Sequence, residues 1–391
     1  MSKTDSESQI EISSLLPAHP LLIQHHGKGA NGIYGPMKEW AQLKKVPPVL
    51  LITGASGIGK RNLAYFLAQW LLCERSGFIE SEEESLSLFG EATPSAPPTP
   101  TSTSTSNDPG PCGECPNCHR ALKGHWVDFL EITPDDPESE TLKIDQFREL
   151  KSKAGFGAHE GAYRIVLIPH ADHMTVQAAN SMLKLLEEPP HRWIFFLTAS
   201  DPTLLLPTIV SRCQILRLKP FPAETITSLL LQGGVPQERA QITSHLAQGS
   251  WGKGWELAQE EKWSRRQAVF DFISDPATQL APLLDWAAIN QHSFNFLVDQ
   301  LEQITTDLVR YSLEATPPTP ESYSWKNTDG APALVRHVKM ARQQLGPLEK
   351  VRHFWLDRAE RLAQARQDSG IPLNRKILTQ DILLPWLTIH G

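Results

Sequence analysis

A glycine-rich loop between two apolar runs constrains the fold of this chain most strongly. Residues 54–60 read GASGIGK; a short β-type run, 49–53, precedes them, and apolar residues recur at helical spacing from 63 to 71. In a strand–loop–helix unit, the GxxxxGK spacing lets backbone N–H groups and a lysine surround phosphates at the helix N-terminus. The sequence therefore predicts a nucleotide-binding loop formed by Gly54, Gly57, Gly59 and Lys60.

The residue after this lysine is unsuited to nucleotide hydrolysis. Active enzymes carry Ser or Thr there, whose hydroxyl binds Mg²⁺, whereas this chain has Arg61, which offers no lone pair to a metal ion. A second departure follows the apolar run 164–168, where an active ATPase would carry Asp-Glu. This chain has Pro169 and His170 at those positions, and Asp172 lies further along. Both departures predict that the chain does not hydrolyse ATP.

Length and charge exclude several classes of protein. The 391 residues are enough for two or three domains, at roughly 100–200 residues per domain. A net charge of −7 argues against an extended basic surface for nucleic acid. The first residues lack the apolar core of a signal peptide, and no apolar stretch approaches the ~20 residues that span a bilayer. We therefore expect a cytoplasmic protein.

Apolar β-type runs alternate with helical patterns after the glycine-rich loop. The β-type runs cover 127–132, 164–168, 193–198 and 214–218, and the helical patterns cover 144–154 and 176–188. This alternation predicts an α/β fold with a doubly wound, mostly parallel sheet, in which ligands bind at the carboxyl ends of the strands. After Pro220 the pattern is helical, and an apolar stripe within 294–314 predicts the core of a helix bundle.

Three further segments have compositions that do not favour a packed core. Residues 1–20 are polar, and residues 80–111 are rich in Glu, Pro, Ser and Thr. Because such segments bury too little apolar surface to offset their ordering entropy, we expect both to be disordered. The segment 19–35 contains His25 and His26, which we expect in a solvated loop rather than in a metal site.

The cysteines indicate a structural zinc site. Cys112, Cys115 and Cys118 lie at i, i+3 and i+6, a spacing that can present three thiolates to one tetrahedral ion. Cys73 is the preferred fourth ligand, because the low-complexity segment can loop out between the two parts of the site; His119 is the alternative. With four protein ligands no position remains for water, so the zinc would be structural.

Three motifs resemble the signature blocks of bacterial clamp-loader subunits, which belong to the AAA+ proteins. They are NSMLKLLEEPP at 180–190, FFLT at 195–198 and SRC at 211–213, in the order and at the spacing of that family. The chain is identified as a member of the DNA polymerase III clamp-loader family, most similar to a subunit with defective ATPase motifs and inserted cysteines. The resemblance is strong from about 45 to 220 and weaker on either side.

The family implies a division into domains. A AAA+ P-loop module would occupy 21–220, with a parallel five-stranded sheet, helices on both faces and a zinc-binding insertion within 73–118. A helical lid domain would follow at 221–265. A helical collar domain at 266–391 would assemble a pentamer.

The family also implies a role in DNA replication. The chain would join gamma or tau subunits and delta in a heteropentamer that opens the sliding clamp and places it on primed DNA, as part of a DNA-directed DNA polymerase. In the family the arginine of the SRC motif reaches into a neighbour's ATP site, so Arg212 is expected to act as an arginine finger in trans. The chain itself would be a stator without turnover.

Gly252, the block 180–190 and Cys213 are not expected to take part in catalysis or metal binding. Active relatives have a sensor arginine near 249–253, where this chain has Gly252, a third departure from an active site. The block 180–190 is expected to be structural, a helix that prolines end. Cys213 lies apart from the other cysteines and is expected to be a small buried residue.

Two other functions remain open from the sequence. The first is an active ATPase of the gamma or tau type, with Mg²⁺ held through water and Asp172 or His170 as the base. The second is a zinc-dependent DNA-binding protein, which the net charge of −7 disfavours. The sequence also leaves open whether residues 54–60 still bind nucleotide.

Overall fold

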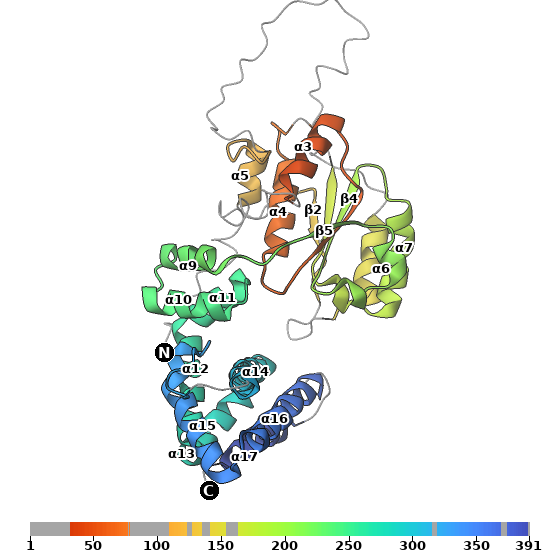
Figure 1. Cartoon of the computed structure of the whole chain (residues 1–391). Helices are drawn as coiled ribbons and strands as arrows, with labels where there is room; N and C mark the ends of the chain where they lie inside the picture. Colours follow the sequence, from red (N-terminus) through yellow and green to blue (C-terminus); the bar gives the residue numbers. More distant parts are fainter. Residues whose placement is uncertain are drawn as a thin grey trace, which may run out of the picture. The chain divides into compact units, whose positions relative to one another are not determined.

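The computed structural model divides the chain into two compact units (Figure 1). The first comprises Met1–Pro222 with Ser250–Gly252, and the second comprises Ala223–Gly249 with Lys253–Gly391. The expectations for 1–20, for 80–108 and for His25 and His26 lie outside the described residues. The structure describes residues 32–76, 78, 109–122, 127–134, 141–153, 163–314, 319–368 and 374–389.

The first unit is built on a parallel sheet of five strands within the described ranges, in the order β2-β3-β4-β1-β5. Val49 pairs with Phe195, Leu50 with Gln214, and all neighbouring strands run parallel. The predicted sheet is confirmed, and each strand falls on a predicted run. The strands are β1 (Val49–Thr53), β2 (Phe129–Glu131), β3 (Arg164–Ile168), β4 (Trp193–Ala199) and β5 (Gln214–Arg217).

Helices cover both faces of this sheet, as Figure 1 shows. Helix α4 (Lys60–Leu71) lies on one face, and α6 (Ile144–Lys153) and α7 (Val176–Glu187) lie on the other. Central strands β1 and β4 are buried along their whole length, which explains their continuous apolar sequences. The other elements of this unit are α3 (Tyr34–Leu43), α5 (Pro116–Leu122), η2 (Ala171–His173), η3 (Pro202–Leu204) and α8 (Pro207–Val210).

Local sequence signals set the ends of α7. The Thr175 hydroxyl accepts a hydrogen bond from the Ala178 N–H at 3.2 Å and so caps the first turn. The helix ends just before Pro189 and Pro190, as predicted. Its apolar face, including Met182, packs into the same core as strands β1, β3 and β4.

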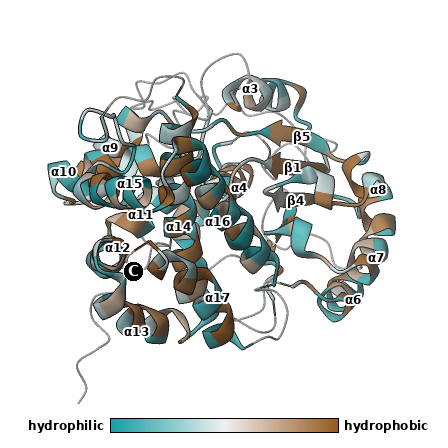
Figure 2. Cartoon of the chain, turned by 60° about the horizontal axis from the view of Figure 1, so that its bottom comes forward, coloured by the Kyte–Doolittle hydropathy of each residue, from teal (hydrophilic) through white to brown (hydrophobic). Residues whose placement is uncertain are grey.

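All regular secondary structure among the described residues of the second unit is helical. The apolar stripe predicted within 294–314 lies on α14, and its members Leu297, Leu301, Ile304 and Leu308 are fully buried. Figure 2 shows hydrophilic and hydrophobic residues side by side along these helices, as expected for a bundle. Its elements are α9 (Ala223–Gln232), α10 (Gln237–Leu246), α11 (Trp251–Ala258), α12 (Glu260–Ser274), α13 (Pro276–Ala287), α14 (Gln291–Leu313), η4 (Thr328–Gly330), α15 (Ala331–Leu345), α16 (Leu348–Asp368) and α17 (Arg375–Leu387).

A buried arginine on α12 forms hydrogen bonds to residues of α14 and η4. Arg266 of α12 is fully buried and forms a bidentate ion pair with Asp329 of η4, at 2.7 and 2.8 Å. Its guanidinium also donates to Gln300 of α14 at 2.6 Å and to Asn327 at 2.8 Å. Every nitrogen of the guanidinium therefore has a partner, which is the condition under which a buried charge is tolerated.

Replacing Arg266 by Met is expected to lower the free energy of unfolding by about 3–5 kcal/mol, because Asp329 would remain buried without its cation. Urea unfolding of the full chain, followed by circular dichroism, measures the loss. Lys376→Ala is the control: it breaks an exposed ion pair with Asp285 and should cost less than about 1 kcal/mol. Equal losses for the two variants would contradict the role given to Arg266.

No helix within the described ranges combines the length and the apolar character that a membrane span requires.

Candidate functional site

The glycine-rich loop joins β1 to α4 and has the backbone of a phosphate-binding loop. Gly54, Gly57 and Gly59 have φ angles of 150°, 74° and 97°, in the region that favours glycine. Gly59 directly precedes α4, so the loop ends at a helix N-terminus. The structure therefore places the predicted glycines in the arrangement that can surround an anion.

Lys60 is held by the loop itself. Its ammonium donates to the carbonyl oxygens of Gly54 at 2.7 Å and Ala55 at 3.0 Å, and to the Ser200 hydroxyl at 3.2 Å. Burial lowers the pKa of Lys60, while the nearby charge of Asp172 acts in the opposite direction. The group that would meet the outer phosphates is thus engaged in internal hydrogen bonds.

Arg61 occupies the position of the missing metal ligand and pairs with a carboxylate from β2. Its Nε lies 2.7 Å from Glu131 Oε1, and its terminal nitrogen donates to Oε2 at 2.9 Å. The Tyr65 hydroxyl donates to the same Oε2. Burial and this carboxylate raise the pKa of Tyr65 to about 12. The half-exposed guanidinium of Arg61 therefore pairs with the acidic side chain at the carboxyl end of β2.

The turn after β3 places His170, Asp172 and His173 together, with their candidate ligand atoms within 4.8 Å of one another. However, one Asp172 oxygen accepts the Ser200 N–H at 2.7 Å. The positive charge of Lys60 also acts on this carboxylate. One Asp172 oxygen therefore anchors the backbone that follows β4, whereas the other, Oδ1, is buried and has no hydrogen-bond partner among the described residues.

The segment Ser250–Gly252, which belongs to the first unit, lies against the glycine-rich loop. The Gly252 N–H donates to the Gly57 carbonyl at 2.8 Å, and the Ser250 hydroxyl donates to the Ser56 carbonyl at 2.8 Å. A Cβ atom at position 252 would lie 3.0 Å from Gly57 Cα. The close approach explains the glycine at the position where active relatives were expected to carry an arginine.

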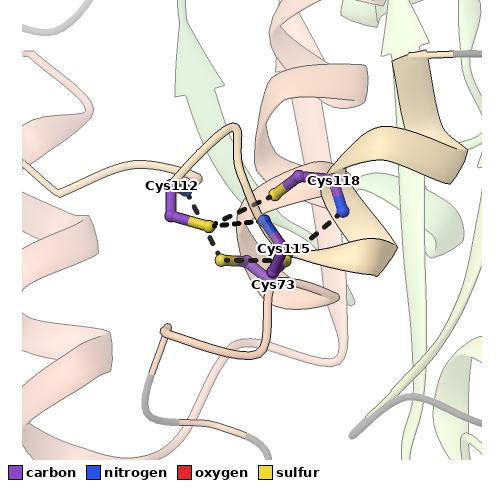
Figure 3. Close-up of side chains that lie close together, drawn as sticks. All are labelled: Cys73, Cys112, Cys115 and Cys118. Carbon is purple, nitrogen blue, oxygen red and sulfur yellow. Dashed lines mark hydrogen bonds between the residues drawn. The ribbon is translucent and has the colours of Figure 1, made fainter.

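Four cysteines from two separate segments form one cluster, shown in Figure 3. Cys73 follows α4, Cys112 and Cys115 precede α5, and Cys118 lies within α5. A hydrogen bond from the Cys118 thiol stabilises the Cys73 thiolate and lowers the pKa of Cys73 to about 5. The same hydrogen bond, together with burial, raises the pKa of Cys118. His119, the alternative fourth ligand, is exposed.

The cluster fits a tetrahedral zinc ion. The sulfurs of Cys112 and Cys118 are 3.9 Å apart, as are those of Cys73 and Cys115. Zinc–sulfur bonds of about 2.3 Å in a tetrahedron separate the sulfurs by about 3.8 Å, whereas a disulfide requires about 2 Å. The N–H groups of Cys115 and Cys118 point at the sulfurs three residues earlier, at 3.3 and 3.4 Å. These donors would stabilise thiolates bound to a metal ion.

Arg212 follows α8 and borders an open hollow. Its guanidinium donates to the Thr208 carbonyl at 2.6 Å and forms an ion pair with Glu187 at the end of α7. Neighbouring Cys213 donates its thiol hydrogen to Ile209 O at 3.1 Å, and burial raises its pKa to about 11. Cys213 is half-buried against the core, rather than fully buried as expected. The hollow is lined by Pro48, Leu186, Glu187, Pro189, Ser211 and Arg212.

Comparison with known proteins agrees with these motifs. A family model described as DNA polymerase III, delta subunit, matches residues 100–222. DNA polymerase III subunit delta' of Yersinia pestis is 27% identical over 347 residues, which cover 87% of this chain and 88% of the relative. The chain is similar to the delta' subunits of bacterial DNA polymerase III along most of its length.

The chain is also similar to a second subunit of that polymerase. DNA polymerase III subunit tau of Escherichia coli is 30% identical over 184 residues, 47% of this chain and 23% of tau. Among solved structures, a gamma subunit-related protein of DNA polymerase III from Thermotoga maritima has a TM-score of 0.40 and 16% identity, and the match covers 91% of this chain and 99% of that chain.

Sequence reasoning missed Glu131, Glu187 and Ser250, whose partners lie far away in the sequence. One signal was available for Glu187. It lies at the carboxyl end of a helix, where the helix dipole disfavours a negative charge. An acidic residue at such a position indicates a cationic partner elsewhere in the fold.

Proposed function

We propose that this chain is a clamp-loader subunit of bacterial DNA polymerase III that completes the ATP site of a neighbouring subunit and does not hydrolyse ATP itself. Similarity to relatives named as the delta' and tau subunits of that polymerase supports the first part. The neighbour would be a gamma or tau subunit.

The observation that carries the second part is the contact between Arg61 and Glu131. In an active site of this kind, position 61 supplies a hydroxyl to Mg²⁺. Here a bidentate ion pair occupies that position, and Lys60 is bonded to carbonyl groups of its own loop. The alternative of an active ATPase, with Asp172 or His170 as its base, would have to hold Mg²⁺ through water beside the positive charge of Arg61, which disfavours a metal ion there.

The assembly would be a heteropentamer with gamma or tau and delta, which loads the sliding clamp on primed DNA in the cytoplasm. Within it, we assign the lid to 221–265 and the oligomerising collar to 266–391. Arg212 would serve the neighbour's nucleotide. Cys73, Cys112, Cys115 and Cys118 would hold a zinc ion, which when bound would join α4 to α5 without taking part in catalysis.

The isolated chain is expected to show no ATP turnover, because it lacks a metal ligand at position 61. A phosphate-release assay on the purified chain, with and without primed DNA, measures this. The same chain should co-purify with gamma or tau and delta, and the assembled complex should hydrolyse ATP. The proposal fails if the isolated chain turns over ATP and Lys60→Ala abolishes that turnover.

A further inference from the structure

Arg212 is held from two directions, by the helix α8 that precedes it and by α7. One terminal nitrogen donates to the Thr208 carbonyl of α8 at 2.6 Å. The other forms an ion pair with Glu187, the last residue of α7. The contact with Thr208 only folds the side chain back along the preceding helix α8. The contact with α7 fixes the direction in which the guanidinium faces.

We propose that Glu187 is a positioning residue that orients Arg212 for action on a neighbour's nucleotide. This inference rests on the proposed function, in which Arg212 reaches another subunit's ATP. Both side chains border the open hollow of the first unit, together with Pro48 and Ser211. The ion pair therefore lies at an accessible surface, where a phosphate group can approach the remaining N–H donors of the guanidinium.

Helix α7 holds Glu187 in a fixed position, because both of its ends and its apolar face are well anchored. Helix α7 is capped by Thr175 at its start and buries Met182 and Leu186 against the sheet. Two prolines follow it directly, so its last turn cannot continue. A carboxylate at this helix end is disfavoured by the helix dipole, and the ion pair with Arg212 offsets that cost.

Ordering the Arg212 guanidinium before the nucleotide binds should raise the rate of turnover. A free arginine side chain has many rotamers, and restricting them at the moment of reaction adds to the barrier. An exposed ion pair stabilises the folded chain only slightly, but it selects one of those rotamers before the neighbour's nucleotide arrives. Loss of Glu187 should therefore slow turnover at that site without changing the affinity for ATP.

The test uses the complete complex, reconstituted with gamma or tau, delta, the clamp and primed DNA. Glu187→Ala should lower kcat at the ATP site that Arg212 serves by about three- to tenfold, with KM for ATP unchanged. Glu187→Gln should retain most of the activity, because its amide oxygen accepts the same hydrogen bond. Glu188→Ala is the matched control, since Glu188 is the next residue and is exposed; it should match the unmodified complex.

Arg212→Ala separates this inference from the proposed function. If Arg212→Ala slows turnover while Glu187→Ala leaves it unchanged or faster, the positioning role is overturned and the finger role stands. If Arg212→Ala leaves turnover unchanged, both proposals fail. In the Arg212→Ala background, adding Glu187→Ala should have no further effect; an additional loss would show that Glu187 acts on something other than Arg212.

Discussion

Replacing Arg212 by Ala is expected to leave the clamp-loader complex assembled and to abolish most of the turnover at the neighbouring ATP site. A guanidinium that stabilises charge on the transferred phosphoryl group is worth roughly 10³–10⁵ in rate in well-studied GTPases. The whole complex should retain the turnover of its other sites. ATPase assays stimulated by primed DNA and the clamp measure the loss, and size-exclusion chromatography verifies assembly.

Two further variants make this test specific. Arg217→Ala removes another exposed arginine of the first unit, on β5, and should have no effect on turnover. Arg212→Lys keeps the charge but loses the planar donor geometry, so it should recover only part of the rate. Unchanged turnover for Arg212→Ala in an intact complex would eliminate the finger role.

Removal of one cysteine from the cluster should sharply reduce zinc binding. Structural zinc binding is worth about 10–16 kcal/mol in small zinc domains, and one ligand of four accounts for about 3 kcal/mol, or ~10² in affinity. Cys115→Ser should therefore lose its metal to a chelator that leaves the unmodified protein loaded. Elemental analysis after dialysis gives the stoichiometry, with one zinc per chain expected before the substitution.

The fifth cysteine provides the control. Cys213→Ser should keep its zinc, because Cys213 lies outside the cluster. Cys73→Ser should behave like Cys115→Ser, whereas His119→Ala should have no effect. Because thiols must lose protons to bind zinc, affinity should also fall as the pH is lowered. Retention of one zinc per chain by Cys115→Ser would contradict the four-cysteine site.

The sheet could be predicted from the sequence because its central strands β1, β3 and β4 are buried and have continuous apolar sequences. Apolar runs such as 164–168 coincide with β3 as the structure has it. The prediction was less accurate at the edge, where β2 is shorter than the run 127–132 and Val127 is half-exposed. Hydrogen bonds to β3 nevertheless extend to Asp128 and Ile132 on either side of β2, so the pairing covers most of the predicted run.

The contacts of the candidate site could not be predicted in the same way. Local spacing identified three cysteines, and the order of elements suggested Cys73. The partners of Arg61 and Arg212, however, come from other strands and helices. The sequence indicated that Gly252 replaces a sensor arginine but gave no physical reason. That reason is the approach of one backbone to another, which only the folded chain reveals.

The ion pair between Arg61 and Glu131 also bears on how such a subunit can evolve. Restoring Thr at position 61 would supply a hydroxyl for a metal ion, but it would remove the cation that Glu131 now pairs with. The Glu131 side chain is only 15% exposed, so its unpaired charge would reduce stability. If the chain does not hydrolyse ATP, as proposed, then a gain of that activity would require concerted changes on α4 and β2. A single substitution at position 61 would supply the hydroxyl at a cost in stability.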